Sequence, residues 1–166
     1  MEPRLETQQA LSHRHVQEHD QGHSLGAFAV DRFGRISLRD AKGGGLAFRW
    51  RGRAFRIAVE EATASRSGKP SECRMTLSAC AGRMPSSALA ADRRPEAFRM
   101  THGLAPVLPA GWSLTLQPDH VLTLATEIRM TLPAEISALL IQATRFALQL
   151  APYFDLLEQY GMGIEA

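Results

Sequence analysis

Residues 111–140, "GWSLTLQPDHVLTLATEIRMTLPAEISALL", change their hydrophobic period twice and decide the fold. Alternate residues are apolar from Trp112 through Leu114 to Leu116, which is the pattern of a strand with one buried face. A polar turn at residues 117–120 precedes a second alternating run that starts at Leu122. Beyond this run the apolar residues recur at steps of three and four. The stretch therefore predicts a β-hairpin followed directly by an amphipathic helix.

The predicted helix begins near Thr131 and Pro133, because proline at the first helical position costs no hydrogen bond and already has a helical φ. Its apolar residues form one continuous stripe, which comprises Ile136, Leu139, Leu140, Ala143, Phe146, Ala147, Leu150, Phe154 and Leu157. Such a stripe has to pack on a sheet. Pro152 lies inside this pattern and is expected to kink or divide the helix.

Earlier parts of the chain also alternate with period two. We predict strands around Phe28–Val30 and Ile36–Leu38, a hairpin of residues 46–50 and 55–59 around a turn at 51–53, and a strand through Met75 to Ala79. A short helix is predicted between Ser86 and Met100, with Pro95 interrupting it. The expected fold class is α+β: an antiparallel, twisted sheet of about five or six strands with a short middle helix and a long C-terminal helix packed on it.

Length and composition favour one domain plus a tail. The chain has 166 residues, of which 45% are hydrophobic, and a formal net charge of +2. Residues 1–24 are polar and hold four of the six histidines, so we expect a tail or a loosely docked helix there, and a single α+β domain at 25–166. No stretch has the length of a signal-peptide core or of a membrane span, so we expect a cytoplasmic protein. Two cysteines fit reduced structural thiols.

No motif indicates a reaction, and we expect neither an enzyme nor a cofactor. His15, His19 and His23 are spaced by four and could share a metal ion, but a solvated tail is the preferred interpretation and no metal site is predicted. The run from Phe48 to Arg56 interleaves aromatic residues with arginines, which is compatible with nucleic-acid binding. Alternation alone, however, predicts buried aromatics and solvated arginines, so nucleic acid is kept only as an alternative partner.

The order of the predicted elements resembles that of the effector-binding chaperones of bacterial type III secretion, the Tir-chaperone-like family. The segments that carry the resemblance are "FAVDRFGRISLRD" (28–40), "MTLSACAGRMP" (75–85) and "GWSLTLQPDHVLTLATEIRM" (111–130), and it covers roughly residues 25–160. The resemblance implies a non-enzymatic homodimer that holds an extended segment of a secreted effector protein by edge-strand addition and apolar pockets. A small-ligand or metal-binding protein remains a further alternative.

Two sets of apolar residues are candidates for these contacts. Because one helix covers only one face of a sheet, early-strand side chains are expected to remain available to the client, and these are Phe28, Val30, Ile36, Leu38, Phe48 and Trp50. Trp50 is the expected anchor, since a buried tryptophan removes much apolar area from water. Apolar residues in and beside a segment too short to bury them predict a dimer interface, formed by Leu89, Phe98, Met100 and Trp112.

Overall fold

The computed structural model describes residues 23–39, 45–62, 70–88 and 90–163. Six strands come first along the chain: β1 (His23–Leu25), β2 (Phe28–Val30), β3 (Arg35–Leu38), β4 (Gly45–Trp50), β5 (Arg53–Ala62) and β6 (Ser71–Arg83). The helix α1 (Arg94–Leu104) and the 3-10 turn η1 (Ala105–Val107) follow. The chain then forms β7 (Trp112–Leu116), β8 (Val121–Leu132), β9 (Ala134–Glu135) and the helix α2 (Ile136–Gln159).

The α+β class and the antiparallel pairing are confirmed, but the described strands form two sheets. The larger sheet has the order β4-β5-β6-β8-β7, and the smaller has the order β1-β2-β3-β9. All pairs are antiparallel, and the register shifts between Cys80 and Gly82 where β6 pairs with β8. The expected boundary between residues 24 and 25 lies inside β1.

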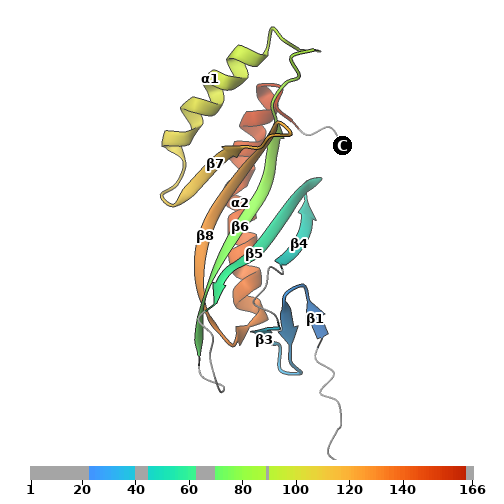
Figure 1. Ribbon diagram of the computed structural model, residues 1–166, viewed down its shortest axis with the longest axis vertical. Helices are drawn as coiled ribbons and strands as arrows, with labels where there is room; N and C mark the ends of the chain where they lie inside the picture. The colour runs from blue at the N-terminus through green and yellow to red at the C-terminus, as the bar shows by residue number, and fades with distance from the viewer. Residues whose placement is uncertain (1–22, 40–44, 63–69, 89, 164–166) are drawn as a thin grey trace, which may run out of the picture.

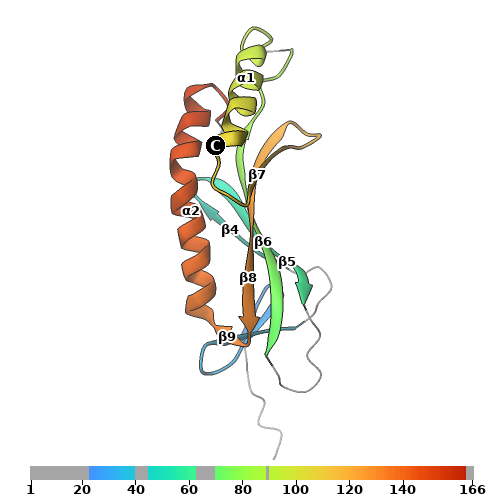
Figure 2. The ribbon, with the colours of Figure 1, turned by 90° about the vertical axis from the view of Figure 1, so that its left-hand side faces the viewer.

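A single helix covers one face of the larger sheet. Figure 2 shows α2 running along that face, with no helix among the described residues on the opposite face. The buried residues of α2 are Leu139, Ala143, Phe146, Ala147, Leu150, Phe154 and Leu157. They meet the inward residues of the sheet, of which Phe55, Ile57, Met75, Leu77, Leu122 and Leu124 are at most 2% exposed. The predicted stripe is therefore the core, except that Ile136 is half-buried and Leu140 is 51% exposed.

The structure corrects the expectations for Pro133 and Pro95, and it excludes a divided helix at Pro152. The helix begins at Ile136 and not at Pro133, because β8 continues to Leu132 and β9 follows a cis Leu132–Pro133 bond. Pro95 lies in the first turn of α1, where its missing N–H interrupts nothing. Pro152 neither divides nor ends α2, since the helix runs on to Gln159 while Phe154 and Leu157 pack in the core.

The small sheet and α1 lie at opposite ends of the larger sheet (Figure 1). At one end the Ile136 N–H donates to the Gly34 carbonyl at 2.8 Å, so α2 starts against the β2–β3 turn. At the other end Met162, which is fully buried, accepts a hydrogen bond of 3.0 Å from the Arg83 N–H. A side chain at Gly82 would collide with the Met162 carbonyl, so glycine is needed at that position. Both ends of α2 are thus fixed to distant parts of the chain.

Candidate functional site

Strand β4 presents one apolar face to α2. Leu46, Phe48 and Trp50 are half-buried, while Ala47 and Arg49 between them are exposed. The Phe48 ring stacks on Phe55 with a centroid distance of 5.0 Å, and Trp50 lies 6.4 Å from the ring of Phe154 in α2. The alternation predicted for residues 46–50 is confirmed, and it places the aromatic side chains on the same side of the sheet as the helix.

A groove lies between β4 and α2. Its volume is about 430 Å³, and its lining residues are Leu46, Phe48, Arg49, Trp50, Leu140, Ala143, Thr144, Ala147 and Leu148. No carboxylate lines the groove, and its side chains are mostly aliphatic or aromatic. We call this site the β4–α2 groove. It is large enough to accept several apolar side chains of a partner.

A shallower depression continues from the groove over the outer side of α2. It has a volume of about 650 Å³ and is lined by Ser137, Leu140, Ile141, Thr144, Arg145, Leu148 and Gln149. Leu140, Ile141 and Leu148 are 51%, 63% and 61% exposed. Isolated exposed leucines are common on protein surfaces, but three on one helix beside an apolar groove form a contiguous patch, and such patches mark interaction sites.

Strand β4 also ends the larger sheet, so one of its edges is unpaired within the described residues. Figure 1 shows it at the margin of the sheet, on the side opposite β7. The start of β4 lies close to the β1–β2 turn, because a side chain at Gly26 would collide with the Gly45 carbonyl. The stretch from Leu46 to Trp50 therefore offers backbone N–H and C=O groups next to the groove.

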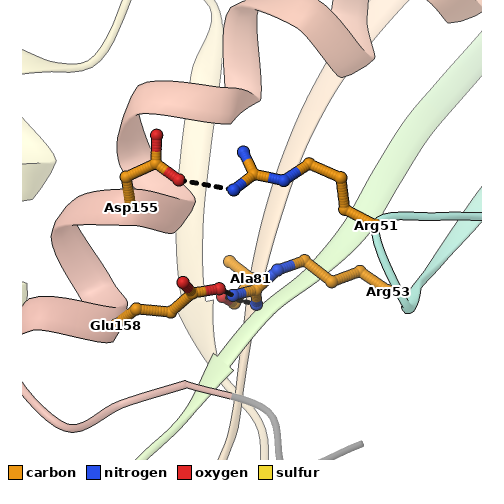
Figure 3. Close-up of polar contacts among 5 residues, drawn as sticks. All are labelled: Arg51, Arg53, Ala81, Asp155 and Glu158. Atoms are coloured by element: carbon orange, nitrogen blue, oxygen red, sulfur yellow. Dashed lines mark hydrogen bonds and ion pairs between the residues drawn. The ribbon is translucent and has the colours of Figure 1, made fainter.

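Two arginines hold the β4–β5 turn against α2 (Figure 3). Arg51 lies 2.7 Å from Asp155, with both side chains about half exposed. Arg53 is only 3% exposed; it pairs with Glu158 at 2.5 Å, donates to the Ala81 carbonyl and lies over the Phe154 ring. Arg51 and Gly52 both have positive φ, as a tight two-residue turn requires. The two ion pairs position the end of β4 relative to the helix.

The predicted client-binding residues lie in two different places. Phe48 and Trp50 line the groove. Phe28 and Ile36 lie in the small sheet with 0% exposure, so a single chain does not offer them to a partner, while Val30 and Leu38 are half-buried there. The helix side of the groove does not follow from the sequence, because Leu140, Ala143 and Ala147 fall in the predicted core stripe. Ile141 and Leu148, apolar residues seven apart and outside that stripe, were the available signal.

The residues predicted for a dimer interface also lie on different elements. Phe98 and Met100 lie on α1 and Trp112 on β7, and all three are half-buried against the core. The Trp112 ring packs 5.1 Å from Phe146 and 6.1 Å from Tyr153. Leu89 lies outside the described residues. The dimer itself stays a prediction.

Two of the four arginines in the 49–56 hairpin, Arg49 and Arg56, are separated from its aromatic rings by strand alternation, whereas Arg51 lies 5.7 Å over the Trp50 ring. Phe48, Trp50 and Phe55 face α2, whereas strand alternation directs the exposed Arg49 and Arg56 to the other face, and Arg49 also borders the β4–α2 groove. A nucleic acid lying over these two arginines could not stack its bases on the three rings. Nucleic-acid binding itself stays an alternative prediction.

Metal-binding side chains and thiols were the remaining polar candidates for a site. Within the described ranges there is no cluster of three or more metal-binding side chains, and His13, His15 and His19 lie outside those ranges. Burial raises the pKa of the Cys73 thiol. Burial also raises the pKa of Cys80, against the opposing charges of Arg53 and Arg83. Both thiols are therefore weaker nucleophiles at neutral pH than an exposed cysteine.

No helix in the described part of the chain is long and apolar enough to cross a membrane. Comparisons with protein-family models, with curated proteins and with solved structures find no match to this chain in any of the three.

Proposed function

We propose that this protein is a non-enzymatic chaperone that binds an extended segment of another protein in the β4–α2 groove. The observation that carries the proposal is the position of this groove, which lies directly beside the unpaired edge of β4. An extended segment can pair its backbone with such an edge and place alternate side chains in the adjacent pocket. Neither interaction needs a catalytic group.

The biological setting of the proposal comes from the resemblance to type III secretion chaperones. The client is then a secreted effector, the compartment is the cytoplasm, and the chaperone is a homodimer. Among the described elements the order of six strands, a short helix, three strands and a long helix supports the resemblance, which also expects a first helix in the region outside the described residues. Binding keeps the client segment extended and competent for secretion.

Leu148 is the most informative position for a test. Its side chain lines the groove and is 61% exposed, so Leu148→Glu puts a charge in the site without opening the core. Phe33 provides the matched control, because it is 72% exposed in the β2–β3 turn of the small sheet. We expect Phe33→Ser to retain client capture. Trp50 is less suitable, since its ring also packs on Phe55 and Phe154.

The experiment first captures binding proteins and then maps where they contact the chain. The wild-type chain and both variants are used to isolate binding proteins from the native cytoplasm, and hydrogen exchange is then measured on the isolated complex. We expect a secreted protein that is captured by wild type and Phe33→Ser but lost with Leu148→Glu, and protection of the β4 amides in the complex. Capture that is insensitive to Leu148→Glu, or unchanged exchange in β4, would refute the site.

The homodimer is tested separately by sedimentation at micromolar concentration. A monomer at that concentration would contradict the dimer, while leaving binding in the groove open to the capture experiment.

A further inference from the structure

An incoming strand at β4 would meet two different surfaces. Cross-strand neighbours lie on the same face of a sheet, so client residues opposite Leu46, Phe48 and Trp50 point toward α2 and into the groove. Client residues between them point to the other face, beside Ala47 and Arg49. The two sets of side chains therefore experience different chemistry.

The second surface is basic next to β4. Pairing of β4 with β5 places Ala47 opposite Arg56 and Arg49 opposite Ala54. The two arginines therefore lie diagonally across the strand pair, each beside an alanine. All four residues are exposed. Arg49 donates to the Gly52 carbonyl at 3.3 Å, and its guanidinium retains further donors. In the described part of the chain no carboxylate is paired with Arg49 or Arg56.

We propose that the groove selects extended segments in which apolar residues alternate with acidic ones. Three apolar side chains enter the groove, and the intervening carboxylates lie on the opposite face beside Arg49 and Arg56. Ala47 lies opposite Arg56 and two residues before Arg49 on the same face of the sheet, so we expect its small side chain to leave room for a client carboxylate beside both arginines. This inference rests on the proposed function and adds the sequence pattern of the client to it.

The same charges disfavour a second copy of the chain at this edge. If β4 paired with β4 of another molecule, the arginine-bearing faces of both copies would lie on the same side of the joined sheet. Arg49 and Arg56 would then be brought toward their equivalents, and like charges on neighbouring strands are destabilising. An acidic strand has the opposite effect, so charge complementarity favours a client over self-association.

Synthetic peptides test the pattern directly. Three fluorescent pentapeptides with capped ends alternate valine with glutamate, glutamine or lysine, and their binding to the full chain is measured by anisotropy at low salt. We expect the glutamate peptide to bind about tenfold more tightly than the lysine peptide, with the glutamine peptide between them. Methylating the backbone nitrogens of the glutamate peptide should abolish binding, because it removes the main-chain donors.

Variants separate the two surfaces. In the Arg49→Glu, Arg56→Glu double variant the order of the three peptides should reverse, and circular dichroism checks that this exposed double substitution leaves the fold intact. Should it unfold, Arg49→Gln serves instead and is expected to reduce the preference about threefold. Leu148→Glu should weaken binding of the uncharged glutamine peptide, whereas Phe33→Ser should not.

The outcomes distinguish failure of the acidic pattern from failure of the proposed function. If all three peptides bind equally and lose affinity with Leu148→Glu, the groove binds extended segments as proposed, but the acidic pattern is refuted. If no peptide binds while Leu148→Glu dissociates a dimer in sedimentation, the groove is an interface between copies, and both proposals fail.

Discussion

The buried arginine of the β4–β5 turn supports a quantitative prediction. Glu158→Gln removes the negative charge that faces Arg53 but keeps the size of the side chain. Arg53 is 3% exposed, so water can replace the lost carboxylate only in part, from the side where Glu158 is half exposed, while the Ala81 carbonyl and the Phe154 ring remain in contact with the guanidinium. We expect the folded state to lose stability because a buried cation is left partly uncompensated.

The magnitude follows from the exposure of the two partners. Breaking a fully buried pair costs about 3–5 kcal/mol, but the Glu158 side chain is 50% exposed, so the pair lies partly in water. A hydrogen bond to a charged group contributes about 1.5–3 kcal/mol. We therefore expect Glu158→Gln to lower the free energy of unfolding by about 2 kcal/mol. Asp155→Asn breaks the neighbouring exposed pair with Arg51 and should cost less than about 0.5 kcal/mol.

Urea unfolding monitored by tryptophan fluorescence measures both variants, and Trp50 and Trp112 both pack on core aromatic rings. Adding Arg53→Met to Glu158→Gln completes a double-mutant cycle, for which we expect a coupling energy of at least about 1 kcal/mol. Equal losses for Glu158→Gln and Asp155→Asn would refute the reasoning, because burial of the arginine would then have no energetic effect.

Three further predictions concern single sites. Gly26→Ala should destabilise the fold by about 2 kcal/mol or more in thermal or urea unfolding. Gly26 has φ +59°, and an added Cβ would collide with the Gly45 carbonyl. A neutral effect would show that the β1–β2 turn does not pack against Gly45. Cys80, which is partly exposed, should react with a thiol reagent before the buried Cys73. Because burial raises the pKa of both thiols, the reaction rates should keep rising as the pH increases above about 9. Fast reaction at pH 7 would contradict this. Leu148→Glu should change unfolding stability by less than about 0.5 kcal/mol while reducing binding of an apolar dye; a large stability loss would make Leu148 part of the core.

The strands and the helix core were predictable because each depends on a local period. Phe55 and Ile57 are buried at the alternate positions expected, and so are Phe146 and Phe154 at the helical spacing. The start of α2 was not predictable from Pro133. Proline favours a helix start locally, but β8 pairs with β6 up to Leu132 and β9 pairs with β3 at Ala134 and Glu135, so the helix begins only after these strands. Local periods also do not reveal that the strands divide between two sheets.

The groove could be predicted only in part. Alternation identified Phe48 and Trp50 as one face of a strand, but whether that face is covered depends on the lateral position of α2 over the sheet. The partners of Arg51 and Arg53 are 104 and 105 residues away in the chain, so no local pattern indicates them. For the same reason Arg49 and Arg56 looked like one surface with the aromatic side chains in the sequence, although strand alternation directs these two arginines to the other face.

The attachment of both ends of α2 has a consequence for binding thermodynamics. Backbone hydrogen bonds join Ile136 to Gly34 at one end and Arg83 to Met162 at the other, so the helix cannot shift along the sheet without breaking one of them. The wall of the groove is then already in position before a ligand arrives, and the protein loses little conformational entropy on association. A flexible client bears most of that entropic cost, so stiffening the client, for example by cyclising a peptide in its extended form, should strengthen binding far more than stiffening the protein.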